Sequence, residues 1–255
     1  MATPARTTKS AASAKPARPR KKMSPLTIIG LVLLACGLVW LAINGGAIIE
    51  RYRMTWYLEK KYGEEFVVSR PVRKANGIGV KGHMEAEAYP KGDPDLVFSV
   101  THSPRLITDE YAGAVWSREE TARLKPVITD AFGGGVKYSV EIKTTGTMQG
   151  PLPLKGRIPN FSDGADTYGK KIFYILRLKG TEVPNDTERL MIARKILGIK
   201  NSLPLDKVDM TVGYSVRYSE AGEDYVFGTS VSGEELAVIR DPKQIVDNFK
   251  KARTY

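Results

Sequence analysis

The feature that most constrains this chain of 255 residues is an uncharged segment, Met23 to Ile49, that follows a basic tail. Within it, the 24 residues from Leu26 to Ile49 contain one strongly polar side chain, Asn44. As an α-helix this stretch would reach about 36 Å, and the hydrocarbon core of a bilayer is about 30 Å thick. A soluble helix of that length should have a polar face, which is missing here. The sequence therefore predicts a single transmembrane helix over residues 25–49.

The basic residues on the two sides of this segment predict its orientation. The first 22 residues carry seven Lys or Arg and no acid, whereas the far flank carries four: Arg51, Arg53, Lys60 and Lys61. Cytoplasmic flanks are richer in Lys and Arg. We therefore expect a single-pass protein of the cell membrane, with a cytoplasmic N-terminus and an extracytoplasmic domain from residue 50 on.

Two other interpretations of the segment stay open. A cleavable signal peptide has a shorter apolar region that ends at small residues, and here the apolar run continues. The stretch Leu33 to Cys36 looks like a bacterial lipobox, in which the cysteine would be lipidated, although the sequence after it does not become polar. Cys36 is the only cysteine, so the outer domain can hold neither an internal disulfide nor a cysteine metal site.

Composition and patterning divide the chain into four parts. Residues 1–24 have almost no apolar side chains and should be a disordered cytoplasmic tail; residues 25–49 form the membrane segment. The triplet Gly133 to Gly135 then separates two subdomains, 50–133 and 134–255. Because strands and helices occur in clusters instead of alternating, we expect an α+β fold with antiparallel sheet.

Hydrophobic periodicity and cap residues predict the individual elements. The helix predicted from residue 109 to 124 should be interrupted at Pro126, and residues 144–167 should form a loop. A short last helix should begin after Asp241. The other predicted helices are 53–62 and 187–197, and the predicted strands are 66–68, 78–89, 96–100, 137–143, 171–178, 208–218 and 225–231.

Three sequence blocks in residues 57–133 resemble a family of uncharacterised exported or membrane-anchored proteins of Gram-positive bacteria. They are Tyr57 to Phe66 (YLEKKYGEEF), Ala88 to Phe98 (AYPKGDPDLVF), and Ile107 to Tyr111 (ITDEY) followed by Trp116-Ser117. Together they cover about a third of the chain in consistent order. The resemblance implies a bacterial, extracytoplasmic protein with a helix–strands–helix unit, and it assigns no activity or catalytic residue.

No catalytic, cofactor or metal site emerges from the sequence. The two histidines, His83 and His102, fit strands or strand ends and are expected to be structural. The loop from Asp163 to Asp166 could offer oxygen ligands to Ca²⁺ but lacks an EF-hand's spacing, so an Asx-rich turn is preferred. The adjacent acids at 109–110, 119–120 and 234–235 should lie on solvated faces, and Trp116 should be a core residue.

Charge suggests the partners. The stretch Arg51 to Lys81 is basic and could face anionic lipid or an anionic wall polymer, or it could be only a solvated basic face. The tail could touch nucleic acid, but a topology signal is the simpler interpretation, so no nucleic-acid partner is expected. A patterned domain without reactive motifs favours a non-enzymatic envelope module that binds a protein or polymer. The alternatives are an extracytoplasmic hydrolase that uses carboxylates, or a component of a secretion or conjugation assembly.

Overall fold

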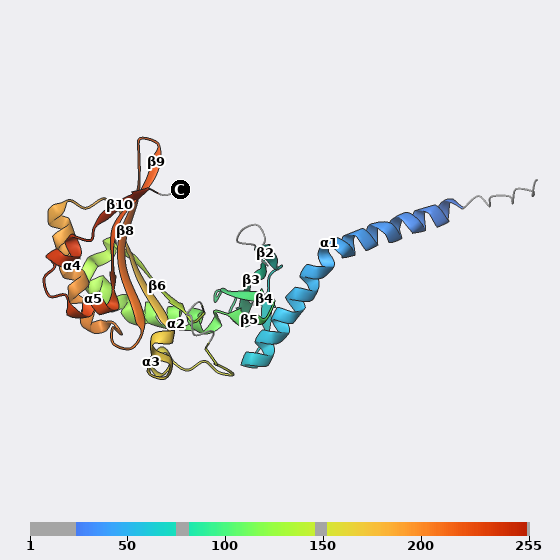
Figure 1. Ribbon diagram of the computed structural model, residues 1–255, viewed down its shortest axis with the longest axis horizontal. Coiled ribbons are helices and arrows are strands. Elements are labelled where there is room, and N and C mark those ends of the chain that lie inside the picture. The colour runs from blue at the N-terminus through green and yellow to red at the C-terminus, as the bar shows by residue number, and fades with distance from the viewer. Residues whose placement is uncertain (1–23, 75–81, 146–151, 254–255) are drawn as a thin grey trace, which may run out of the picture. The chain divides into compact units, whose positions relative to one another are not determined.

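The computed structural model describes residues 24–74, 82–145 and 152–253 (Figure 1). The predicted disordered tail therefore lies almost wholly outside the described residues. The chain divides into two compact units, residues 1–45 and residues 46–255. Each unit is described by itself.

The first element, α1 (Pro25–Tyr62), is one helix of 38 residues. The helix predicted over 53–62 is therefore confirmed in its end and wrong in its start, since these residues continue the helix that begins at Pro25. Gly63 has φ +78° and donates its N–H to the carbonyl of Glu59 at 2.8 Å, which ends the helix in the left-handed conformation that glycine tolerates. In the part of the chain that the structure describes, which inside α1 omits the side chains of Ile28 and residues 40–44, no helix is long and apolar enough to cross a membrane.

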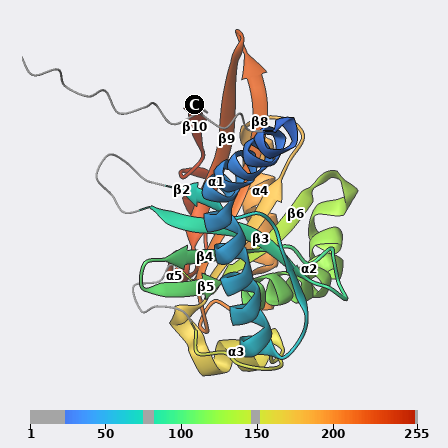
Figure 2. The same ribbon diagram turned by 90° about the vertical axis from the view of Figure 1, so that its right-hand side faces the viewer.

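The last turns of α1 belong to the second unit and pack across a small antiparallel sheet (Figure 2). The sheet has the order β1-β3-β4-β5, and β2 pairs with the other half of β3. Met54 and Leu58 of α1, one helical turn apart, are fully buried against it. Its strands are β1 (Phe66–Val68), β2 (Val72–Lys74), β3 (His83–Pro90), β4 (Phe98–Ser103) and β5 (Leu106–Asp109).

Two details of this sheet depart from the sequence predictions. The strand predicted over 78–89 is β3, which begins at His83, and residues 75–81 lie outside the described part. The strand β5 was not predicted because its four residues give too short a pattern; it forms a tight hairpin with β4. The predicted break near Pro71 is confirmed, since β1 and β2 are separate strands on the same neighbour.

The helix α2 (Tyr111–Phe132) joins the two parts of the second unit. It continues through Pro126, so the predicted interruption is wrong. Pro126 and its neighbour Lys125 face solvent, while Leu124 and Ile128 are buried, so packing holds the helix together across the missing N–H. A 3₁₀ turn, η1 (Gly133–Gly135), follows the helix.

A second, larger sheet has the order β10-β9-β8-β7-β6. Its neighbours are antiparallel except β7 and β8, which pair in parallel. The predicted antiparallel sheet is therefore wrong for this one pair of strands, because α4 carries the chain from the end of β7 back to the start of β8. The strands are β6 (Lys137–Lys143), β7 (Phe173–Lys179), β8 (Asp209–Glu220), β9 (Glu223–Ser232) and β10 (Lys250–Arg253).

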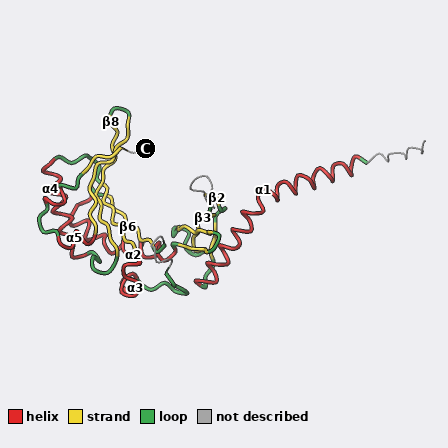
Figure 3. The backbone as a smooth tube through the Cα atoms, viewed as in Figure 1, coloured by secondary structure: helices red, strands yellow, loops and turns green. Residues whose placement is uncertain are grey.

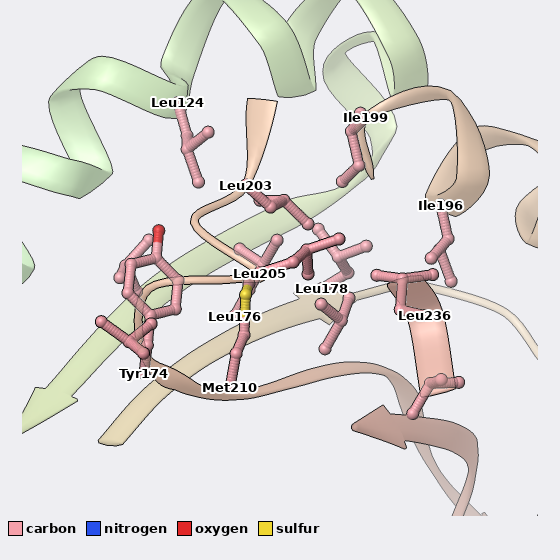
Figure 4. Close-up of a cluster of buried hydrophobic side chains, with 14 of the residues drawn as sticks. Leu124, Tyr174, Leu176, Leu178, Ile196, Ile199, Leu203, Leu205, Met210 and Leu236 are labelled. Carbon is pink, nitrogen blue, oxygen red and sulfur yellow. The ribbon is translucent and has the colours of Figure 1, made fainter. Parts of the chain in front are cut away.

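One face of this sheet is covered by helices, and the fold as a whole is α+β (Figures 1 and 3). The close-up in Figure 4 shows how Tyr174, Leu176 and Leu178 of β7 meet Leu124 of α2 and Ile196 of α4 in the centre of the core. The other helices are α3 (Phe161–Tyr168), α4 (Asp186–Gly198), α5 (Gly233–Val238) and α6 (Lys243–Val246), with the turns η2 (Gly169–Lys171) and η3 (Lys200–Ser202).

Among the helices, α4 confirms its prediction and α3 contradicts one. The side chain of Asn185 caps α4 in a full capping box with Glu188. The region predicted as a loop contains α3, which Asn160 caps by accepting the N–H of Asp163 at 2.9 Å. The predicted last helix is only four residues long; Asp241 accepts the N–H of Lys243 at its start.

The hydrophobic core consists of two clusters that meet at α2. Tyr111 belongs to the cluster under the small sheet, and Ala112 to the larger cluster. Val115 and Ile158 pack against both. The division into subdomains at residues 133/134 stays a prediction. The change from one hydrophobic cluster to the other falls near the start of α2, between Tyr111 and Ala112.

Candidate functional site

A groove of about 1370 Å³ runs along α2. One wall is the stretch from Asp95 to Ser99, which includes the start of β4. The other side is formed by β6 and the first residue of β7, Phe173. The floor of the groove is one stripe of α2, because residues three or four positions apart lie on the same face of a helix. The stripe consists of Ala114, Arg118, Thr121 and Lys125.

The opposite stripe of α2 holds the helix against the larger core. Trp116 is fully buried, and its ring nitrogen donates to the carbonyl of Pro159 at 2.8 Å. Gly164 of α3 lies against this ring, so that an added Cβ would stand 2.4 Å from it. The prediction that Trp116 is a core residue is confirmed. The groove stripe is therefore fixed in place by packing on the other side of the helix.

Side-chain hydrogen bonds attach α2 to the edge of β6. The hydroxyl of Ser117 accepts the N–H of Ile142 at 2.8 Å, and the Tyr138 hydroxyl donates to the carbonyl of Thr121 at 2.8 Å. Gly113 lets the backbones meet, since an added Cβ would lie 2.3 Å from the carbonyl oxygen of Ile142. The bond from Ser117 satisfies one edge N–H of β6, and the closeness of the helix covers an edge that would otherwise be open to a further strand.

Two carboxylates in the groove are already engaged by the protein. Glu110 accepts hydrogen bonds from the backbone and hydroxyl groups of both Thr144 and Thr145. Glu141 pairs with Arg177 and with Lys143. Partial burial acts to raise the pKa of Glu141, but the hydrogen bonds from those two cations outweigh it and hold the pKa below its usual value.

Other charged groups in the groove keep their capacity for contacts. Arg118 reaches Asp93 at 2.5 Å across one end. Lys125, Asp95 and Asp209 form no ion pair with any other described residue. Between them lie apolar surfaces of Leu96, Val140 and Phe173. The groove thus presents both charged and apolar groups along α2.

The histidines do not come together, as expected of structural residues. His102 on β4 is hydrogen-bonded through Nδ1 to Glu50 of α1, and His83 on β3 lies 3.9 Å from Glu85. Within the described ranges, no group of three or more His, Cys, Asp or Glu side chains gathers where a metal ion could bind.

The loop proposed for Ca²⁺, Asp163 to Asp166, is in fact part of α3. Asp163 contacts the cap residue Asn160, and Asp166 forms an ion pair with Lys207 at 2.6 Å. Both acids lie on α3 and already have partners, so they do not converge as ligands for a cation. The Asx-rich turn preferred for this segment is likewise replaced by a capped helix.

Among the adjacent acids at 119–120 and 234–235, the predicted solvated position is wrong for Glu120, whereas Glu119, Glu234 and Glu235 are exposed. Glu120 is buried and receives hydrogen bonds from Arg123 and from the Tyr174 hydroxyl at 3.0 Å. Glu119 accepts the N–H of Phe161 at the start of α3. Glu235 belongs to a capping box with Ser232, and its neighbour Glu234 is exposed.

The pair at 109–110 departs most from the predicted solvated position. The Asp109 side chain is fully buried and accepts hydrogen bonds from Tyr62 at 2.7 Å, Lys61 at 2.7 Å and Tyr57 at 3.0 Å. Burial, and then the Asp109 charge, raises the pKa of both tyrosines well above its ordinary value. The sequence offered one signal: three polar residues, 57, 61 and 62, lie on the helical face that also carries Leu58.

The basic stretch from Arg51 to Lys81 is less free than its composition suggested. Lys61 belongs to the Asp109 network, and Lys74 pairs with Glu85 at 2.7 Å. Arg53 pairs with Glu50 at 2.9 Å. Lys60 lies over the ring of Trp56 at 4.6 Å. The end of the stretch, residues 75–81, is outside the described part.

Comparisons with known proteins give little. No family model matches the chain, and no curated protein does. One solved structure, a DUF5037 family protein from Ruminococcus gnavus, aligns over 67% of this chain and 75% of its own, with 16% sequence identity and a TM-score of 0.34. Similarity at this level establishes neither a shared fold nor a function.

Proposed function

We propose that this is a single-pass protein of the bacterial cell envelope whose extracytoplasmic domain binds a segment of another envelope protein in the groove along α2. Residues 25–49 are the anchor and residues 50–255 carry the binding module. The groove is the observation on which the proposal depends. The resemblance of residues 57–133 to exported proteins of Gram-positive bacteria belongs to the same proposal.

The engagement of Glu110 and Glu141, two of the four carboxylates that line the groove, favours binding over hydrolysis. A carboxylate hydrolase needs one acid with a raised pKa beside another that stays ionised. Glu110 is occupied by two threonines, and the pKa of Glu141 is lowered by its cations. Such side chains shape a surface but do not supply an acid.

The outer face of α1 supports a position next to a membrane. Residues 48, 49, 52 and 56 recur at helical spacing and are exposed, with Tyr52 at 76% and Trp56 at 56%. Aromatic rings of this kind suit the interface between lipid and water. Lys60 and Arg51 on the same segment could contact anionic headgroups or an anionic wall polymer.

Cysteine labelling in intact cells tests the sidedness. In a Cys36→Ser background, Ser10→Cys reports on the tail and Thr181→Cys on the domain, where residue 181 is exposed. A membrane-impermeant maleimide should label the second variant before lysis and the first only after it. The opposite pattern would refute the proposed orientation.

Photocrosslinking tests the groove. A photoreactive amino acid at Ala122, which lines the groove on α2, should capture one reproducible protein in intact cells. The matched control is Thr129, which is exposed on the same helix and is not part of the groove. Equal capture from both positions, or none from Ala122, would contradict groove binding.

A further inference from the structure

The larger sheet has one face that helices do not cover. Burial alternates along β8, where Met210, Val212 and Tyr214 point into the core and the residues between them point to the other side. The same alternation along β6, β7 and β9 assigns the odd-numbered residues of β6 and β7 and the even-numbered residues of β9 to this second face. We call it the open face.

One row of residues crosses the open face over all five strands. Strand register places Lys137 opposite Lys179, Lys179 beside Ser215, Ser215 opposite Gly228, and Gly228 opposite Lys250. All three lysines are exposed. With neighbouring strands about 4.8 Å apart, the row extends roughly 19 Å.

The charges in this row are not balanced by the protein. Two lysines directly opposite each other on one face repel, which destabilises a sheet. Among the described residues, Lys137, Lys179 and Lys250 form no ion pair, and neither does Arg217 on the same face. The acids Glu141 and Asp224 on this face already have partners, and Asp209 lies six residues from Ser215 along β8, about 20 Å from the row. The row therefore presents positive charge that an external anion could neutralise.

The centre of the row leaves room for such an anion. Ser215 has a small side chain and Gly228 has none. A Cβ added at Gly228 would lie 2.2 Å from the carbonyl oxygen of Tyr214, so the close pairing of β8 and β9 requires a glycine there. Together these two residues leave a shallow strip between Lys179 and Lys250. A linear chain could lie along it with anionic groups near both ends.

We infer that the open face binds a linear phosphodiester polymer without bases, laid along the row from Lys137 to Lys250. Phosphate groups match the separated lysines as point charges. Neutral glycans and nucleic-acid bases stack on exposed aromatic rings, whereas the ring of Phe173 on this face is partly buried at the groove end. A bilayer surface is disfavoured because the exposed large apolar side chains of α1 have no counterpart here.

The deciding variant is Lys179→Glu, tested in the full chain in phosphatidylcholine nanodiscs. Binding of a fluorescent poly(glycerol phosphate) should weaken about tenfold or more, which corresponds to about 1.4 kcal/mol, since the substitution removes one basic contact and adds a charge that repels phosphate. The thermal midpoint should not fall, because the new carboxylate faces Lys137 and removes a repulsion. A misfolded variant would instead lose stability along with binding.

The matched control is Lys243→Glu, which makes the same charge change on α6, an element of the helix-covered side. It should leave polymer affinity within twofold of the parent, and the parent's affinity should fall as salt rises. Equal loss in both variants would mean that only net charge matters and would overturn the inference.

Two competitor probes exclude the other anions. A single-stranded oligonucleotide with the same number of phosphates should bind more weakly than the polymer. Vesicles containing phosphatidylglycerol should bind the parent protein no better than they bind Lys179→Glu. Tighter binding of the oligonucleotide, or lipid binding that depends on Lys179, would overturn the inference. Neither result bears on groove crosslinking at Ala122, so failure here leaves the proposed function standing.

Discussion

At the scale of single residues, Asp109 is the side chain that most firmly ties the parts of the second unit together. It lies at the end of β5, and three donors from the last turns of α1 converge on its buried carboxylate. The N–H of Tyr111, at the start of α2, also reaches it at 3.2 Å. One carboxylate thus fixes a helix, a strand and the entry of a second helix.

Replacing Asp109 by Ala should lower the free energy of unfolding by about 3 kcal/mol, because Lys61 and two tyrosine hydroxyls would be left without their acceptor. Chemical denaturation followed by circular dichroism measures the loss. The control Asp95→Ala, at an exposed position, should stay within about 0.5 kcal/mol of the parent. A loss that small at Asp109 would mean that water replaces the carboxylate.

The raised pKa of Tyr174 predicts that the folded protein loses stability at alkaline pH. Burial, and then the Glu120 charge, raises the pKa of this tyrosine above its ordinary value of 10.0. Above pH 10 the unfolded chain therefore loses a proton that the folded chain keeps, and stability falls with rising pH by about 1.4 kcal/mol per unit.

Tyr174→Phe should remove that part of the slope when denaturation curves at pH 9 and pH 11 are compared. Phenylalanine keeps the packing against Phe161, so the core should survive. An unaltered slope in Tyr174→Phe would show that its hydroxyl titrates freely.

Some of these residue roles were predictable and others were not. Gly63 and Asn185 follow local rules, since a left-handed glycine and a capping side chain act within a few residues of their own position. The burial of Asp109 and Glu120 depends on partners about 50 residues away. A sequence shows an acid, but only the fold shows which donors surround it.

At the scale of elements, α2 owes its length to packing more than to propensity. A proline in a helix interior removes one hydrogen bond and costs about 3 kcal/mol. Pro126 nevertheless lies in the middle of a helix that continues to Phe132, because Leu124, Ile128 and Phe132 are all buried on one side. Tertiary contacts here override a strong local signal.

Pro126→Ala should therefore raise the free energy of unfolding by about 2 kcal/mol, the helix penalty less the entropy that alanine restores to the unfolded chain. Thermal unfolding of the two forms, monitored by circular dichroism, gives the difference. The neighbouring substitution Lys125→Ala should change stability by less than about 0.5 kcal/mol. A destabilised Pro126→Ala would mean that the proline sets a bend that the core needs.

Elements with a long pattern were predictable, and short or paired features were not. The strand Lys137–Lys143 was predicted with its observed bounds because alternation over seven residues is clear. The strands β5 and β10 have four residues each, too few for a period. Parallel pairing of β7 with β8 is a property of two strands and the crossover α4, which no single window contains. For the same reason the groove, built from β4, α2 and β6, could not be predicted.

At the scale of the whole second unit, the two hydrophobic clusters should unfold together. They are not separated by a linker: α2 contributes Tyr111 to one and Ala112 to the other, and Val115 packs against both. The hydrogen bond from Gly156 to the carbonyl of Lys61, 2.7 Å, adds a second connection between the segment before α3 and the end of α1. Loss of either cluster would expose apolar surface of the same helix.

This coupling makes a prediction about cooperativity. Leu58→Ala creates a cavity in the small-sheet cluster and should cost about 2–5 kcal/mol. If the clusters form one cooperative unit, the free energy of opening measured by native-state hydrogen exchange should fall by the same amount in the protected amides of β7 and β8, far from the substitution. The reciprocal variant Leu176→Ala, in the larger cluster, should speed up exchange in β3 and β4 equally. Faster exchange confined to the substituted side in each case would show that the domain unfolds in two independent steps, and α2 would then have to belong to only one of them.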